Sequence, residues 1–225
     1  TKNGLMKKTT LESYSRPRTN GIIALGLRED DRLIRVTLTD GKSQMLVASY
    51  NGKVVRFPED TVRPMGRTAT GVRAIKLDED GRDRVIGMIC VEEGSKDSVL
   101  VISEKGYGKR TLLDDENGEA IYRITNRGGK GVKTMNLSDK TGNLIGLEAV
   151  NDDMDLMLIT KSGTAIRMAM NTINVLGRAT QGVKLIELQK RNDTLMFGCT
   201  VPKEEQEEVA ETTEDSAQDA TATEE

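Results

Sequence analysis

A pattern of two elements occurs four times in this chain of 225 residues. The first element is a turn dipeptide followed by a short strand that carries a cation four residues after the glycine. Its copies are Asn3-Gly4 with Lys8, Asn51-Gly52 with Arg56, Lys105-Gly106 with Arg110, and Ser162-Gly163 with Arg167. The second element is a glycine, a β-branched residue and then spaced aliphatic residues, and it begins at Gly21, Gly71, Gly131 and Gly182. Repeats of 50 to 60 residues are typical of an array of β-blades rather than of a helical solenoid.

Apolar runs with the length of a strand recur at two further places in the pattern. One run starts at Leu33, Val85, Leu144 and Leu195, and the other directly precedes the last three turn dipeptides, at 45–48, 99–102 and 156–159. Asn-Gly and similar pairs between such runs indicate tight hairpins. We therefore predict an all-β fold over residues 1–202, with four short strands from each copy and about four blades. The first turn has no apolar run before it, which predicts that the chain is a piece of a longer array.

Charge is distributed unevenly along the sequence. Residues 203–225 hold ten acidic residues and one lysine, whereas residues 1–202 hold 32 basic and 26 acidic residues. The first 202 residues therefore carry a net charge of +6, although the whole chain carries −3. An acidic segment with so few apolar residues cannot bury enough surface to offset its ordering entropy, so we predict a disordered tail. Such a tail either competes with an anionic ligand for the basic body or serves solubility alone.

Histidine is absent and cysteine is rare, which excludes several classes of chemistry. Without histidine the chain has no Ser-His or Cys-His nucleophile pair and lacks the commonest metal ligand. Cys90 and Cys199 lie in apolar runs and are expected to be free thiols, which suggests a reducing, cytoplasmic compartment. No apolar run is long enough to span a membrane. None of the four tyrosines has a neighbouring carboxylate cluster suited to magnesium, so we expect neither a catalytic site nor a cofactor in this chain.

The repeated cations are the best candidates for binding. Basic residues that recur in register on a positively charged body suit an extended anion such as duplex DNA, because neutralising its phosphates releases counterions. For any single cation, the alternative is that it lies on a solvent-exposed face of a strand and binds no ligand. The candidate DNA-binding residues of the first element are Lys7, Lys8, Arg56, Lys109, Arg110 and Arg167.

A second set of cations precedes the glycine of the second element. Its densest part is Thr125–Gly131, whose glycines allow backbone N–H groups to approach a phosphate while Arg127 and Lys130 supply charge. The alternative is a flexible glycine turn without a ligand. Gly106–Thr111 lacks the spacing of a nucleotide-binding loop, so we expect no nucleotide there. The candidate DNA-binding residues of this set are Arg16, Arg18, Arg63, Arg67, Arg123, Arg127, Lys130 and Arg178.

These motifs together resemble the C-terminal domain of the DNA gyrase A protein. The similarity is strongest at 51–57, 106–111 and 177–183, and it covers residues 1–202. The resemblance implies a β-pinwheel, in which four-stranded blades form a disc and duplex DNA bends around a basic perimeter. It also implies a bacterial, cytoplasmic, nucleoid-associated protein that acts with the rest of gyrase A and with gyrase B in ATP-dependent negative supercoiling. The cleavage tyrosine and the sites for ATP and magnesium would lie in parts absent from this chain.

The sequence departs from that family in two respects. The family domain usually has six blades, whereas about four are present here, and the family's box Gln-Arg-Arg-Gly-Gly-Lys-Gly normally belongs to the first blade. Thr125–Gly131 matches the last five positions of that box but lies in a later blade, as a partial copy would. Two alternatives stay open at this point. One is the related C-terminal domain of topoisomerase IV, and the other is a propeller-like scaffold whose cations bind an acidic protein.

Overall fold

A computed structural model describes residues 1–92, 94–188 and 193–203. These residues form short strands and contain no α-helix, so the predicted all-β class is confirmed. Three short 3-10 turns occur: η1 (Leu11–Tyr14), η2 (Glu59–Thr61) and η3 (Met170–Thr172). The strands are β1 (Leu5–Met6), β2 (Gln44–Ser49), β3 (Lys53–Pro58), β4 (Val72–Arg73), β5 (Val85–Val91), β6 (Ser98–Ser103), β7 (Tyr107–Leu112), β8 (Val132–Lys133), β9 (Leu144–Val150), β10 (Met154–Thr160), β11 (Ala165–Ala169), β12 (Val183–Lys184) and β13 (Leu195–Pro202). The predicted acidic tail, apart from its first residue, lies outside the described residues.

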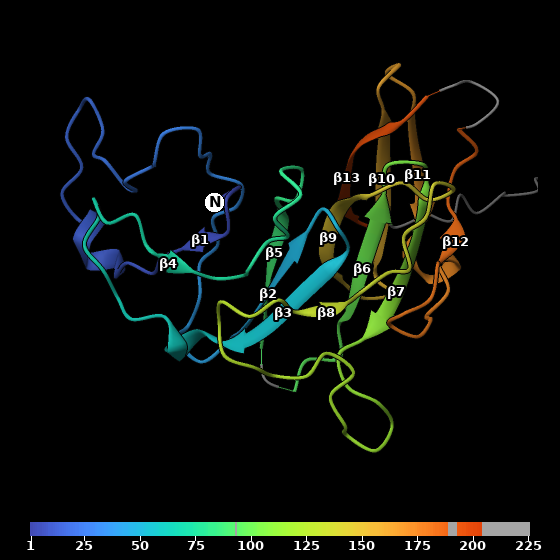
Figure 1. Ribbon diagram of the computed structural model, residues 1–225, viewed down its shortest axis with the longest axis horizontal. Helices are drawn as coiled ribbons and strands as arrows, with labels where there is room; N and C mark the ends of the chain where they lie inside the picture. The colour runs from blue at the N-terminus through green and yellow to red at the C-terminus, as the bar shows by residue number, and fades with distance from the viewer. Residues whose placement is uncertain (93, 189–192, 204–225) are drawn as a thin grey trace, which may run out of the picture.

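The strands form four antiparallel sheets that follow one another across the molecule (Figure 1). We call these sheets blades 1 to 4. In this order they are β1-β4, β5-β2-β3-β8, β12-β7-β6-β9 and β11-β10-β13. Blades 2 and 3 have the four strands that the repeats predict, whereas blade 1 has two strands and blade 4 has three.

In blades 1 to 3, a strand from the next repeat completes the sheet. In blade 2, β8 follows Gly131 and pairs with β3, and in blade 3, β12 follows Gly182 and pairs with β7. In blade 1, β4 follows Gly71 and pairs with β1. We call β4, β8 and β12 the completing strands. The repeat in the sequence is therefore offset from the blade in space, because the second element of each repeat belongs to the preceding blade.

A glycine leads each completing strand because its backbone touches the neighbouring hairpin. A Cβ atom on Gly131 would lie 2.5 Å from the carbonyl oxygen of Val54, and one on Gly182 would lie 2.7 Å from that of Gly108. The φ angles of Gly131 and Gly182 are 72° and 82°, which other residues rarely adopt. Both space and backbone conformation therefore require glycine at these positions.

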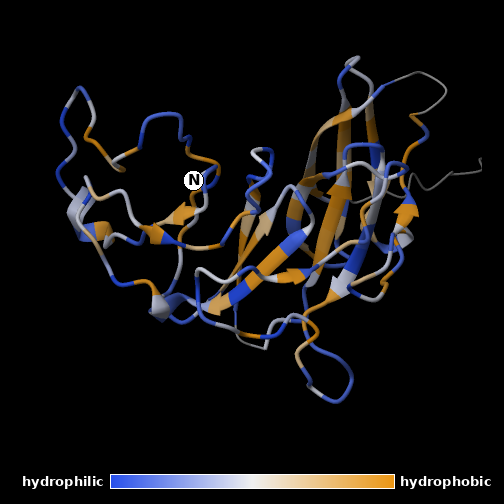
Figure 2. Cartoon of the chain, viewed as in Figure 1, coloured by the Kyte–Doolittle hydropathy of each residue, from blue (hydrophilic) through white to orange (hydrophobic). Residues whose placement is uncertain are grey.

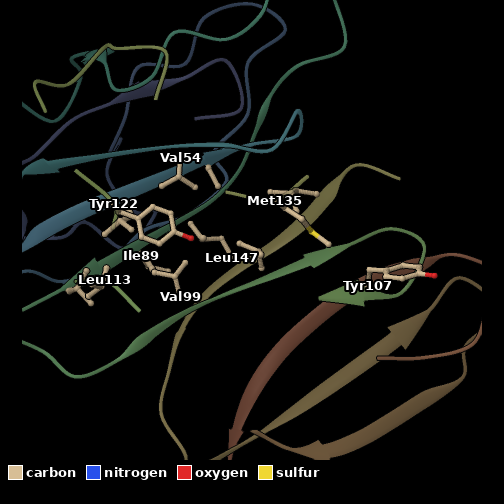
Figure 3. Packing of buried hydrophobic residues seen from close by; sticks show 13 residues of the cluster. Val54, Ile89, Val99, Tyr107, Leu113, Tyr122, Met135 and Leu147 are labelled. Carbon is tan, nitrogen blue, oxygen red and sulfur yellow. The ribbon is translucent and has the colours of Figure 1, made fainter. Parts of the chain in front are cut away.

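Three apolar clusters fill the spaces between the blades. Figure 2 shows the strands of blades 2 to 4 mostly as hydrophobic and many of the connecting loops as hydrophilic. The cluster between blades 2 and 3 includes Tyr122 and Met135, which are fully buried (Figure 3). The hydroxyl of Tyr122 lies 2.6 Å from that of Thr134, so its polar end has a partner inside the core. The other two clusters lie on either side of this one, around Phe57 and around Leu156.

The strand predicted to start at Leu33 does not form. The side chains of Leu33, Val36 and Leu38 are 50%, 74% and 76% exposed. The corresponding strands β5, β9 and β13 each pair with the strand before a turn dipeptide, namely β2, β6 and β10. Only Thr1 and Lys2 precede the first turn dipeptide in the sequence, and among the described residues no strand pairs with this run.

Replacing Gly131 by alanine tests the close contact between a completing strand and its hairpin. Gly81 is a matched control because its φ is 71° but its surroundings are open. We expect Gly81→Ala to lower the free energy of unfolding by about 1–2 kcal/mol through backbone strain. Gly131→Ala should cost at least about 2 kcal/mol more, because β8 must also move away from Val54. Urea unfolding measures both values, and equal losses would contradict the contact.

Candidate nucleic-acid interface

Three of the predicted DNA-binding cations are buried. Arg56, Lys109 and Arg110 expose 6%, 0% and 8% of their surface. They lie on β3 and β7. One edge of each strand pairs with its hairpin partner, and the other edge contacts the segment that leads to the next completing strand. We call this segment the returning segment. Isolated parallel bridges join Arg56 to Ile124 and Arg110 to Val175 at that second edge. The structure therefore places these three predicted DNA-binding cations inside the blades and not at the surface.

The Arg56 guanidinium ties the returning segment to β3. Its Nη1 donates to the carbonyl oxygens of Leu113 and Tyr122 at 3.2 and 3.1 Å, and to Asp114 Oδ1 at 2.8 Å. Its Nε donates to Gln44 Oε1 at 2.5 Å. Hydrogen bonds from a charged donor are stronger than neutral ones, and these are formed where little water competes. Arg56 is thus a structural residue of blade 2.

Equivalent cations in the neighbouring blades make comparable contacts. Arg110 Nε donates to the carbonyl oxygen of Ile173 at 2.9 Å, and its Nη1 donates to Asp152 Oδ1 at 2.5 Å. Lys8 Nζ donates to the carbonyl oxygen of Glu59 at 3.2 Å and lies 3.4 Å from Oε1 of the same residue. In blades 1 to 3, the cation four residues after the turn glycine therefore holds the segment that leads to the next completing strand.

Lys109 is fully buried and holds a loop of its blade. Its Nζ donates to the carbonyl oxygens of Gly177 and Arg178 at 2.5 and 2.6 Å, and to Thr180 Oγ1 at 3.1 Å. These three acceptors match the three donors of a lysine ammonium group. Burial, followed by the nearby Arg178 charge, lowers the pKa of Lys109 to about 8.

Lys7 holds the corresponding loop of blade 1. Its Nζ donates to the carbonyl oxygens of Gly66 and Arg67. Burial and then the Arg67 charge also lower the pKa of Lys7. Lys7 and Lys109 both stand three residues after their turn glycine, so the same position serves the same purpose in two blades.

The Thr125–Gly131 segment lies against the preceding blade. Its backbone exchanges two hydrogen bonds with residues 74–76. Arg127 donates through Nε to the carbonyl oxygen of Thr61 at 3.1 Å and through Nη1 to that of Arg73 at 3.3 Å. Arg127 is therefore partly engaged in joining blade 2 to blade 1.

A cavity of about 190 Å³ lies beside this segment. Its lining includes Arg56, Arg123 and Lys130, which the structure brings together, and also Val55 and Gly129. Two of these cations, Arg123 and Lys130, are exposed and can meet an anion from outside. The cavity is thus a basic recess at the edge of blade 2 where β8 joins β3.

The remaining predicted cations differ in exposure. Arg167 is exposed, and its guanidinium pairs with Asp155 and donates to the carbonyl oxygen of Pro202. The other exposed members of the predicted set are Arg16, Arg18, Arg63, Arg123 and Lys130. The half-buried members are Lys7, Lys8, Arg67, Arg127 and Arg178.

Three exposed cations were not predicted from the sequence. Arg73, Lys133 and Lys184 are the second residues of the completing strands β4, β8 and β12, and all three are exposed. Each directly follows the glycine and the valine of the second element, and this position was the available signal. We call Arg73, Lys133 and Lys184 the rim row. Because the completing strands are equivalent, the rim row presents one cation from each of three successive blades.

Two kinds of feature are absent from the described part of the chain, namely a cluster of metal-binding side chains and a long apolar helix. There, no group of three or more His, Cys, Asp or Glu side chains is placed to hold a metal ion. No helix among those residues is long and apolar enough to cross a membrane. Cys90 and Cys199 are free thiols, as expected, and burial raises the pKa of Cys90.

Comparison with known proteins identifies the family. The family model for the DNA gyrase C-terminal domain, a β-propeller, matches residues 1–40, 44–92, 97–151 and 155–197. The chain belongs to this family. The DNA gyrase A protein of Staphylococcus aureus strain NCTC 8325 / PS 47 is 42% identical over 224 residues, which cover 100% of this chain and 24% of the relative. That of strain MRSA252 is 45% identical over 188 residues, which cover 84% and 20%.

Solved structures confirm the β-pinwheel fold. The C-terminal domain of DNA topoisomerase IV has a TM-score of 0.80 at 22% identity and covers 89% of this chain and 60% of its own. The C-terminal domain of DNA gyrase A has a TM-score of 0.74 at 23% identity and covers 88% and 63%. At such identities the structures establish the fold alone. The chain spans about a quarter of the length of the curated gyrase A proteins that it matches.

Replacing Arg56 by alanine should destabilise the fold rather than only weaken binding. The change leaves the carbonyl oxygens of Leu113 and Tyr122 without their donor, and we expect the free energy of unfolding to fall by about 2–4 kcal/mol. Arg123→Ala, at an exposed position, should change it by less than about 0.5 kcal/mol. Urea unfolding of both variants measures these values. A loss for Arg56→Ala as small as that for Arg123→Ala would show that the buried contacts are not structural.

The lowered pKa of Lys109 predicts a pH dependence of stability. Between its folded pKa of about 8 and its ordinary value of 10.5, the unfolded chain binds more protons than the folded chain at this site. The free energy of unfolding should therefore rise with pH through this window, relative to a Lys109→Met variant. Urea midpoints of both proteins across the window measure the difference. The exposed Lys161, replaced by methionine, serves as the control, and a constant difference for Lys109→Met would contradict the prediction.

Proposed function

We propose that this chain binds duplex DNA along its rim of exposed cations and bends it, as a part of the DNA gyrase A protein. The observation that carries the proposal is the rim row of Arg73, Lys133 and Lys184. One exposed cation at the same place in each of three blades matches a ligand whose charge also repeats. The phosphate backbone of DNA is such a ligand, and its neutralisation drives binding without sequence preference.

Other exposed cations extend the rim row. Arg123 and Lys130 border the basic recess of blade 2. Arg63 stands eight residues before Gly71, and Arg123 stands eight residues before Gly131, so these two are equivalent as well. The net charge of +6 on residues 1–202 adds a general attraction for a polyanion. Together the rim row, Arg63, Arg123 and Lys130 offer six exposed cations for phosphate contacts.

The buried cations support this function indirectly. Arg56 and Arg110 fix the returning segments, and Lys109 fixes a loop, through contacts with backbone carbonyl groups. A surface that bends DNA must resist the elastic force of the duplex, because bending it costs several kcal/mol. Rigid attachment of the rim to the blades therefore favours bending over adaptation of the protein to straight DNA.

The family suggests a role in a larger enzyme. The curated relatives are DNA gyrase A proteins, and the chain matches about a quarter of their length. We propose that it acts with the rest of gyrase A and with gyrase B, in the bacterial cytoplasm and close to the nucleoid. In that setting, bending of DNA by this domain would support ATP-dependent negative supercoiling by the whole enzyme. We assign no catalytic residue and no cofactor to the chain itself.

The dependence of DNA affinity on salt tests the rim. Six phosphate contacts predict that the logarithm of the binding constant falls against the logarithm of salt concentration with a slope of about −5. Replacing Arg73, Lys133 and Lys184 together by alanine should flatten the slope by about three units. Fluorescence anisotropy with a duplex several helical turns long measures both slopes.

A control triple variant replaces Lys42, Lys96 and Lys161, which are exposed but lie outside the proposed rim. It should change the slope by less than about one unit. A slope near zero for the unmodified chain would exclude binding to phosphates and favour an acidic protein partner. Equal flattening by both triple variants would instead show that binding depends on net charge and not on the rim row.

A further inference from the structure

Two loops of the same design precede completing strands. Residues 66–71 precede Val72 of β4, and residues 177–182 precede Val183 of β12. Each loop begins with Gly-Arg, makes a backbone hydrogen bond from its fourth residue to its first, and ends in a glycine with positive φ. In each loop the carbonyl oxygens of the first two residues accept hydrogen bonds from a lysine of the adjacent hairpin.

The loop arginine of blade 3 reaches the blade before it. Arg178 Nη1 donates to the carbonyl oxygen of Lys133 on β8. The N–H of Asn136, which follows β8, donates to the carbonyl oxygen of Thr180 at 3.0 Å. A continuous set of contacts thus leads from Lys109 through the 177–182 loop to the completing strand of blade 2. It connects the strands that carry Lys133 and Lys184.

Blade 2 shows what happens where this lysine is missing. Val55 takes the place of Lys7 and Lys109 three residues after the turn glycine. Val55 borders the cavity of about 190 Å³ beside the Thr125–Gly131 segment. Where the lysine is present, its Nζ donates hydrogen bonds to the carbonyl groups of the loop. In blade 2 the equivalent arginine, Arg127, still donates to the carbonyl oxygen of Arg73 on β4 at 3.3 Å. The lysine therefore adds a second attachment, from the loop to its own hairpin, to the one that the loop arginine makes with the preceding blade.

We propose that Lys109 is a positioning residue that acts through Arg178. By holding the 177–182 loop it keeps Arg178 on the carbonyl group of Lys133, and so fixes the spacing of Lys133 and Lys184 along the bound DNA. The inference rests on the proposed DNA-bending function and adds a residue that does not touch DNA. The burial of the Lys109 ammonium and its three protein acceptors support this, because they leave it no donor for a phosphate.

A double-mutant cycle in the full chain tests the proposal. The variants are Lys109→Met, Arg178→Ala and the double variant. The probe is a duplex several helical turns long with a donor dye and an acceptor dye at its ends. We expect each single change to weaken binding by about three- to tenfold and to reduce the change in energy transfer on binding. The double variant should lose no more than Arg178→Ala alone, because both changes remove the same contact with blade 2.

Several controls make the result decisive. Lys105→Met removes a lysine of the same hairpin that donates to another carbonyl group, that of Asp139, and should change affinity by less than about twofold. If Lys109 and Arg178 act independently, the losses multiply to about 10- to 100-fold and the proposal fails. It also fails if Lys109→Met bends DNA as the unmodified chain does. Absence of bending by the unmodified chain would instead refute the proposed function.

A second cycle covers the case in which Lys109→Met does not fold. Thr180→Ala removes only one of the three acceptors of the Lys109 ammonium group, at an exposed position, and is a milder change. Its combination with Arg178→Ala should show the same lack of additivity in both affinity and energy transfer. Additive losses in this cycle overturn the proposal, because the loop contact of Lys109 would then act independently of Arg178.

Discussion

The fold depends on the glycine-led strands that cross from one repeat into the preceding blade and complete the hairpins of blades 2 and 3. The backbone of Gly131 or Gly182 comes so close to the neighbouring hairpin that a side chain would collide with it. Because β4, β8 and β12 each cross into the preceding blade, no blade is built from one stretch of sequence. The same crossing places Arg73, Lys133 and Lys184 at equivalent points of successive blades. The spacing of the rim row is therefore a consequence of how the blades are joined.

Cations serve two different purposes in this architecture. Arg56, Arg110 and Lys109 replace water at the carbonyl groups of segments that lack regular strand partners. Unpaired carbonyl groups in such places would cost free energy, and a long cationic side chain satisfies one or two of them here. The rim row instead lies at exposed positions, where Lys184 also pairs with Glu187 at 2.7 Å. A basic repeat protein can thus carry many cations of which only part are available to an anion.

The repeats could be recognised from the sequence because turn chemistry and apolar runs recur at nearly constant spacing. The strand class, the hairpins of blades 2 to 4 and the importance of the second element were predicted in this way. The strand at Leu33 was predicted wrongly because the pattern of a strand does not show whether a partner strand exists. A periodic pattern describes one segment, whereas the pairing of a strand requires two segments.

The side on which a cation lies was harder to predict. Alternation along a strand separates two faces only when one of them is open to water. On β7 both Lys109 and Arg110 are buried, because the strand is covered on both faces and has neighbours on both edges. The rim row was missed for the opposite reason, since a two-residue strand is too short for any alternation to appear.

Blades 2 and 3 support their loops by different means. The 177–182 loop accepts hydrogen bonds from Lys109, whose charged side chain is fully buried. The Thr125–Gly131 segment has no such lysine, but it has Gly128, Gly129 and an exposed Lys130 above a cavity. Its cation is on the outside and its support is the preceding blade, through residues 74–76. The partial family box therefore places an exposed cation between two glycines, on a segment that is held by the preceding blade and not by a lysine of its own hairpin.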